Sequence, residues 1–124
     1  MPATDEPRRP RILVVDDMAE VAKGLRTGLS RLGYEVKIAF DAEAALHMAR
    51  SFQPDIALID IVLPGMSGYE LARRLKGDRS LCIVAMSGRP DDPRVESPIF
   101  EERFLKPFSL ESMHDAFLKL LRTN

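Results

Sequence analysis

Five side chains with useful chemistry stand at the end of a short apolar run or directly after one: Asp16, Asp17, Asp60, Ser87 and Lys106. The runs have the length of buried strands, as in ILVV at 12–15 and LCIVAM at 81–86. In an open parallel sheet, ligands bind outside the carboxyl ends of the strands. If these runs form one such sheet, the five side chains meet at a single edge.

Three carboxylates at one edge require a counter-ion, because neighbouring negative charges repel each other where water is scarce. Aspartate oxygens suit Mg²⁺ or Mn²⁺, and Mg²⁺ commonly shares its site with phosphate oxygens. The Lys106 ammonium could pair with a phosphate or with Asp60, and the Ser87 hydroxyl could donate to a phosphoryl oxygen. Because phosphoryl transfer depends mostly on positioning and charge neutralisation, the set predicts that reaction with Asp60 as nucleophile.

Simpler interpretations of these residues stay open. Asp16 and Asp17 could cap a helix, because acidic side chains favour helix starts. Ser87, in SGRP, could be only a turn residue. Asp91 and Asp92 lie in a proline-rich loop, and we interpret them as solvated turn residues rather than a second metal site.

Strand-like and helix-like segments alternate, which predicts a parallel sheet with helices on both faces. The expected strands are 11–15, 34–39, 55–60, 81–86 and 103–106. The expected helices follow position 18 and the caps Asp41, Ser67 and Ser109. The polar alternation of 34–39 indicates a sheet edge, and Ser67 with Glu70 predicts a capping box. Three prolines leave the segment 88–99 room for a loop or a helix of about two turns.

Composition bounds the class of protein. With 124 residues, the chain has the size of one domain. Its 18 basic and 19 acidic residues give no net charge that favours nucleic acid. The single cysteine, Cys82, fits a reducing compartment, and no apolar stretch approaches the roughly 20 residues that span a bilayer. We expect a cytoplasmic protein with a flexible tail at 1–10, no membrane partner and no direct binding of nucleic acid.

Four motifs, in order, resemble those of the receiver domains of bacterial two-component response regulators: ILVVDD, DIALIDIVLPGMSGYEL, AMSG and FLKPFS. The resemblance covers residues 11–122. It implies a (βα)5 flavodoxin-like fold, a three-layer sandwich with a five-stranded parallel sheet in the order 2-1-3-4-5. The fourth helix of that fold would fall in 88–99 and is expected to be short or missing. No further domain is expected, so we interpret the chain as a stand-alone receiver.

The resemblance also implies a role for each metal-site residue. Asp60 matches the phosphoacceptor, and Asp16 and Asp17 match the acidic pair that holds Mg²⁺. Val62 matches the residue whose backbone carbonyl completes the metal site. Because an apolar Val62 side chain cannot orient an attacking water, we expect slow self-dephosphorylation.

The phosphate-binding and switch residues follow in the same way. Ser87 matches the switch hydroxyl, Gly88 the small residue that leaves the phosphoryl group access, and Lys106 the lysine before the characteristic proline. The family usually has an aromatic switch residue three positions before that lysine, where this chain has Arg103. Phe104 lies one position later, and because strand side chains alternate faces it cannot simply replace Arg103.

The resemblance implies a histidine kinase or histidine phosphotransfer protein as phosphodonor, and an unidentified downstream protein as output partner. The chain would then be no enzyme in the ordinary sense, although it would assist its own aspartyl phosphorylation and dephosphorylation. Its output would be altered protein binding. Two alternatives stand beside this hypothesis: a receiver-like module whose binding is independent of phosphorylation, and a small flavodoxin-like enzyme. The enzyme is disfavoured because no glycine-rich loop follows the first strand.

Overall fold

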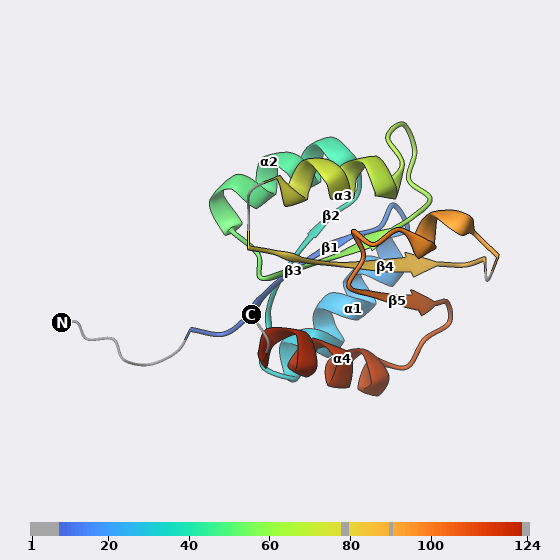
Figure 1. Cartoon of the computed structure of the whole chain (residues 1–124). Coiled ribbons are helices and arrows are strands. Elements are labelled where there is room, and N and C mark those ends of the chain that lie inside the picture. Colours follow the sequence, from blue (N-terminus) through green and yellow to red (C-terminus); the bar gives the residue numbers. More distant parts are fainter. Residues whose placement is uncertain (1–7, 78–79, 90, 123–124) are drawn as a thin grey trace.

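The computed structural model describes residues 8–77, 80–89 and 91–122 (Figure 1). One parallel sheet runs in the order β2-β1-β3-β4-β5. Its strands are β1 (Arg11–Val15), β2 (Glu35–Ala39), β3 (Ile56–Asp60), β4 (Cys82–Ser87) and β5 (Glu102–Leu105). The helices are α1 (Ala19–Arg31), α2 (Ala42–Phe52), α3 (Gly68–Lys76) and α4 (Leu110–Arg122). The expected flavodoxin-like fold and strand order are confirmed.

Helices cover both faces of the sheet, α2 and α3 on one and α1 and α4 on the other (Figure 1). Alternate strand residues enter the two apolar layers. Leu13 and Ile59 pack in the layer under α2 and α3, whereas Ile12 and Leu58 pack in the layer with α1 and α4, and all four are fully buried. Because both faces are covered, the central strands are uninterrupted apolar runs.

The strand β2 and the connection between β4 and β5 agree with the sequence predictions. β2 is an edge strand and mostly half-buried. In place of the helix between β4 and β5, the chain forms a short 3-10 helix, η1 (Pro93–Glu96). The expected short or missing helix in this segment is therefore confirmed.

Side-chain caps begin three of the helices. The Asp41 carboxylate accepts the Ala44 N–H, the Ser67 hydroxyl accepts the Glu70 N–H, and the Ser109 hydroxyl accepts the Ser112 N–H. The predicted capping box also requires the Glu70 carboxylate to accept the Ser67 N–H, and this part of the prediction is wrong. The Glu70 carboxylate pairs with Arg73 and Arg74 instead. Two guanidinium groups within one helical turn are stronger partners for this carboxylate than one backbone N–H.

The predicted tail at 1–10 lies only partly in the described chain, because residues 1–7 fall outside the described residues. Arg8 forms an ion pair with Asp55, and the Pro10 carbonyl accepts the Glu35 N–H at 2.9 Å. Residues 8–10 therefore lie against the amino ends of the strands. Among the described residues, no helix has the length and apolar character needed to cross a bilayer.

Candidate functional site

The register of the sheet brings the predicted residues to one edge. Val15 lies beside Ile59, so Asp16 follows β1 next to Asp60 at the end of β3. Asp60 in turn lies beside Met86, one residue before Ser87. The parallel strands therefore deliver the three side chains to neighbouring positions, as the sequence predicts.

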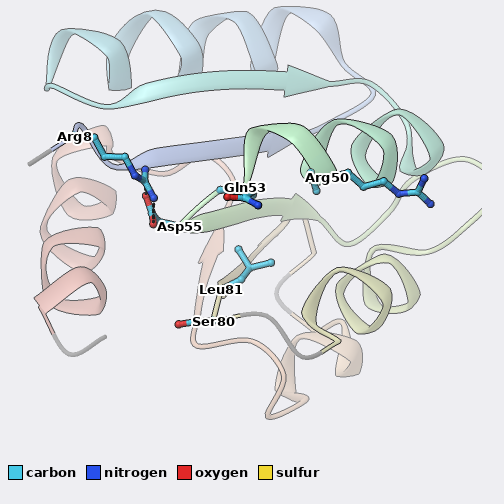
Figure 2. A pocket seen from close by; sticks show the side chains of 8 residues that line it. Arg8, Arg50, Gln53, Asp55, Ser80 and Leu81 are labelled. Carbon is cyan, nitrogen blue, oxygen red and sulfur yellow. Dashed lines mark hydrogen bonds and ion pairs between the residues drawn. The ribbon is translucent and has the colours of Figure 1, made fainter. Parts of the chain in front are cut away.

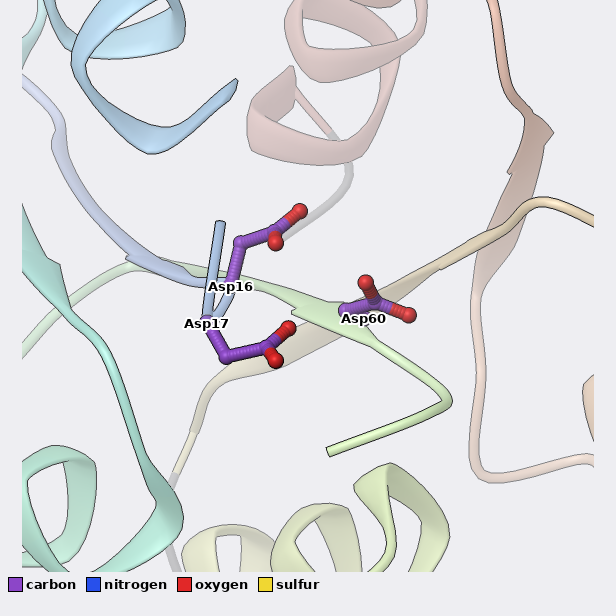
Figure 3. Close-up of side chains that lie close together, drawn as sticks. All are labelled: Asp16, Asp17 and Asp60. Atoms are coloured by element: carbon purple, nitrogen blue, oxygen red, sulfur yellow. The ribbon is translucent and has the colours of Figure 1, made fainter. Parts of the chain in front are cut away.

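Asp16, Asp17 and Asp60 form a compact acidic cluster (Figure 3). One carboxylate oxygen from each residue lies within 4.8 Å of the others. Asp16 and Asp60 are buried, at 0% and 7% exposed, whereas Asp17 is exposed. Two buried carboxylates beside a third, accessible one match the hard-oxygen ligand set of a small divalent cation that keeps some of its water.

Lys106 connects the two buried carboxylates. Its Nζ lies 2.9 Å from Asp16 Oδ2 and 2.8 Å from Asp60 Oδ2. Burial alone would lower the pKa of Lys106, but the hydrogen bonds and charges of Asp60 and Asp16 raise it above the ordinary value. In their ionised forms, three carboxylates and one ammonium leave two negative charges uncompensated. One divalent cation would neutralise them, so the residues present fit Mg²⁺ or Mn²⁺.

Backbone amides hold the remaining oxygens of the buried pair. Asp16 Oδ1 accepts the Met18 N–H, and Asp60 Oδ1 accepts the Val62 N–H, both at 2.9 Å. Asp60 is therefore oriented from two sides before any ligand arrives. The assignment of the Val62 carbonyl as a metal ligand stays a prediction.

Ser87 and Gly88 lie at the end of β4. Ser87 is buried at 3% exposed, and its hydroxyl accepts the Arg89 N–H and donates to the Arg89 carbonyl, both at 3.0 Å. The hydroxyl thus closes a turn, which is the simpler interpretation left open for this residue. A Cβ at Gly88 would meet nothing within 4 Å, so the space beside this position is open.

The two candidates for the aromatic switch position differ in burial. Arg103 is exposed, whereas Phe104 is half-buried and its ring centroid lies 6.1 Å from that of Phe108. Phe104 packs in the layer that α1 and α4 cover. The structure therefore places an aromatic ring in this apolar layer rather than at position 103, and a switch role for Arg103 or Phe104 stays a prediction.

The interpretation of Asp92 as a solvated turn residue is wrong. Its side chain is 4% exposed and pairs with Arg94, whose Nη2 lies 2.6 Å from Asp92 Oδ2. The hydrogen bonds from Arg94 lower the pKa of the Asp92 carboxyl to about 2, although burial acts in the opposite direction. The carboxylate also accepts the Arg94 N–H at the start of η1. Asp91 is exposed, as expected.

The structure also has cavities that none of the three clustered aspartates lines. A cavity of about 290 Å³ is bounded by Arg8, Gln53, Asp55 and Ser80 at the amino ends of the strands (Figure 2). Because the carboxylates lie at the carboxyl ends, it is not part of the candidate site. A second cavity, of about 510 Å³, lies between α1 and the segment around Phe108, and Lys106 lines its edge.

A family model described as the response regulator receiver domain matches residues 12–117. The chain belongs to this receiver family. Curated relatives agree: the DNA-binding response regulator MtrA of Mycobacterium tuberculosis is 33% identical over 94% of this chain and 52% of its own length. The response regulator MprA of the same species is 35% identical over 90% of this chain and 50% of its own. The chain thus spans about half the length of these relatives.

Solved receiver structures share the fold. The response regulator TrrA from Thermotoga maritima, solved in complex with Mg²⁺ and BeF, is 30% identical, with a TM-score of 0.79 over 90% of this chain and 98% of its own. A signal receiver domain of an HD domain-containing protein from Pseudomonas fluorescens is 26% identical, with a TM-score of 0.87 over 99% of this chain and 94% of its own.

Proposed function

We propose that this receiver accepts a phosphoryl group on Asp60 from a phosphohistidine of a kinase or phosphotransfer protein, and that it signals through altered protein binding. One observation carries the proposal. The Asp60 carboxylate lies within an acidic cluster that fits a divalent cation and is held 2.8 Å from the Lys106 ammonium. The proposal places the exchange in the cytoplasm, where the buried thiol of Cys82 stays reduced.

The transfer requires no separate general base. An ionised oxygen of Asp60 attacks the phosphorus, and a P–O bond forms as the P–N bond breaks. The electron pair of the broken bond stays on the histidine nitrogen. The Val62 N–H and Lys106 orient the Asp60 carboxylate, and Lys106 stays available for the charge that develops on the phosphoryl oxygens.

Asp16, Asp17 and Asp60 would hold Mg²⁺, which when bound supplies positive charge to the phosphoryl oxygens. Lys106 lies 2.9 Å from one carboxylate oxygen of Asp16 and 2.8 Å from one of Asp60, and its positive charge reduces the repulsion between the two carboxylates. The buried position of Asp16 limits competition by water, and the exposed Asp17 keeps the site open to the donor.

Phosphorylation would also change the turn after β4. An aspartyl phosphate adds negative charge and three acceptor oxygens at the end of β3. The Ser87 hydroxyl, now bonded to Arg89, lies on the neighbouring strand and is a donor for one of these oxygens. Its movement would release the turn that leads to η1, and the rearranged surface would be read by the output partner.

The test is the intact mass of the protein after incubation with acetyl phosphate and Mg²⁺. We expect one phosphoryl adduct in the wild type and none in Asp60→Asn or with a chelator present. An absent adduct after rapid quenching, in a protein that still binds Mg²⁺, would contradict the proposal. It would favour the phosphorylation-independent binding module.

A further inference from the structure

The buried Asp92 and the exposed Arg94 form an ion pair that the receiver resemblance does not explain. Arg94 donates to the Asp92 carboxylate through its backbone N–H, Nε and Nη2, at 3.0, 3.0 and 2.6 Å. The backbone contact alone would cap η1. The two guanidinium contacts add a fixed cation that capping does not require.

The pair lies in the loop that follows β4, and the end of β4 lies beside Asp60 in the sheet. β4 and β3 run side by side, and the loops that follow them leave the sheet at the same end (Figure 1). The pKa of Arg94 is raised mainly by its partner Asp92, and the negative charge of Asp60 raises it further. The direction of this effect agrees with the placement of η1 at the end of the sheet where Asp60 lies.

One nitrogen of the Arg94 guanidinium remains available as a hydrogen-bond donor. Asp92 occupies Nε and Nη2 of Arg94, and Nη1 has no partner among the described residues. The Asp92 side chain is 4% exposed, whereas that of Arg94 is 41% exposed. One face of the guanidinium is thus anchored and another is accessible to a ligand.

We infer that Arg94, anchored by Asp92, is a second cationic ligand of the phosphoryl group on Asp60. The inference rests on the proposed function and deepens it. Arginine pairs with phosphate through a planar set of donors, and a guanidinium already fixed by a carboxylate loses little freedom on binding. In the unphosphorylated protein, Asp92 compensates the charge of Arg94. After phosphorylation, Arg94 bridges Asp92 and a phosphoryl oxygen, which couples η1 to the site.

The test measures binding of BeF₃⁻, a phosphoryl mimic, by ¹⁹F NMR with saturating Mg²⁺. Loss of one charge-assisted hydrogen bond predicts that Arg94→Gln binds about tenfold more weakly than the wild type. Its Mg²⁺ affinity without BeF₃⁻ should equal that of the wild type. Arg74→Gln, which removes an exposed arginine paired with Glu70, should bind BeF₃⁻ as the wild type does.

Removing Arg94 alone leaves the buried Asp92 charge unpaired and can unfold the loop. The double variant Arg94→Gln, Asp92→Asn removes both charges and should show the same weakening. The inference is overturned if both variants bind BeF₃⁻ within twofold of the wild type, or if Mg²⁺ affinity falls in parallel. A wild type that takes no phosphoryl group from acetyl phosphate would instead overturn the proposed function, and the inference with it.

Discussion

Gly68 is the residue where a single added methyl group should disturb the site most. A Cβ at this position would lie 2.3 Å from the backbone oxygen of Asp60 and 2.7 Å from the Cα of Ile61. Ordinary contact begins at 3.4 Å, so the first distance must grow by about 1.1 Å, 3.4 minus 2.3. Both obstructing atoms belong to the backbone, and no side-chain rotation can relieve the clash.

The displacement must move either the start of α3 or the end of β3. Overpacking of this kind costs about 1–3 kcal/mol of stability. A shift of about 1 Å at the reacting group can lower the rate about 100-fold. We therefore expect Gly68→Ala to be destabilised and to be phosphorylated by acetyl phosphate at about one hundredth of the wild-type rate.

Urea unfolding and the rate of adduct formation by intact mass measure the two effects. Gly24→Ala is the matched control, because Gly24 lies inside α1 and its added Cβ meets nothing within 4 Å. That variant should gain about 0.5–1 kcal/mol and keep its rate. The reasoning is refuted if Gly68→Ala is as stable as the wild type and is phosphorylated equally fast.

Four further outcomes follow from the site. Lys106→Met should slow phosphorylation by acetyl phosphate about 10²- to 10³-fold, the usual loss for one donor to developing charge, and a loss below about tenfold would contradict that role. Because folding raises the pKa of Lys106, the charged lysine stabilises the folded protein fully below about pH 10.5, and this stabilisation is lost as the pH rises through the folded pKa. Urea unfolding should therefore show the difference in stability between the wild type and Lys106→Met shrinking above about pH 10.5. Mg²⁺ should raise the stability of the wild type by about 2.7 kcal/mol at one hundred times its Kd, and Asp17→Asn should require more Mg²⁺ for the same shift; equal titrations would remove Asp17 from the site. With the donor removed, the phosphoryl group should persist for minutes or longer because Val62 orients no water, and a half-life of seconds would contradict this.

The acidic cluster could be predicted because strand ends are easy to locate. Uninterrupted apolar runs locate the central strands, and parallel strands end at a common edge. Once Val15 and Ile59 are neighbours in register, the positions of Asp16 and Asp60 follow from the chain itself. Lys106 is far from Asp16 in the sequence. Its position near Asp16 depends on the order of the strands, which the receiver motifs imply.

The Asp92–Arg94 pair could not be predicted, because loop sequence does not determine burial. A proline-rich stretch with adjacent acids is typical of a solvated turn. Burial of Asp92 depends on how the loop that contains η1 folds, which no periodic pattern in 88–99 encodes. The spacing of Asp92 and Arg94, two residues apart, was the one available signal: an acid that caps a short helix can also reach an arginine in its first turn.

The bonding of Ser87 was similarly open. The sequence places a hydroxyl after β4 but does not say whether it points to a ligand or closes a turn. In this structure it closes the turn to Arg89. Phosphate binding by Ser87 therefore requires a local rearrangement, which the sequence alone does not indicate.

The most direct test of the central claim is to locate the phosphoryl group. Borohydride reduces an aspartyl phosphate to homoserine, so treatment after incubation with acetyl phosphate and Mg²⁺ marks the acceptor permanently. Peptide mass spectrometry should find homoserine at position 60 and aspartate at 16 and 17. Homoserine at either of the other two positions, or an unmodified position 60 in a protein that carried the adduct, would contradict the assignment of Asp60 as the phosphoacceptor.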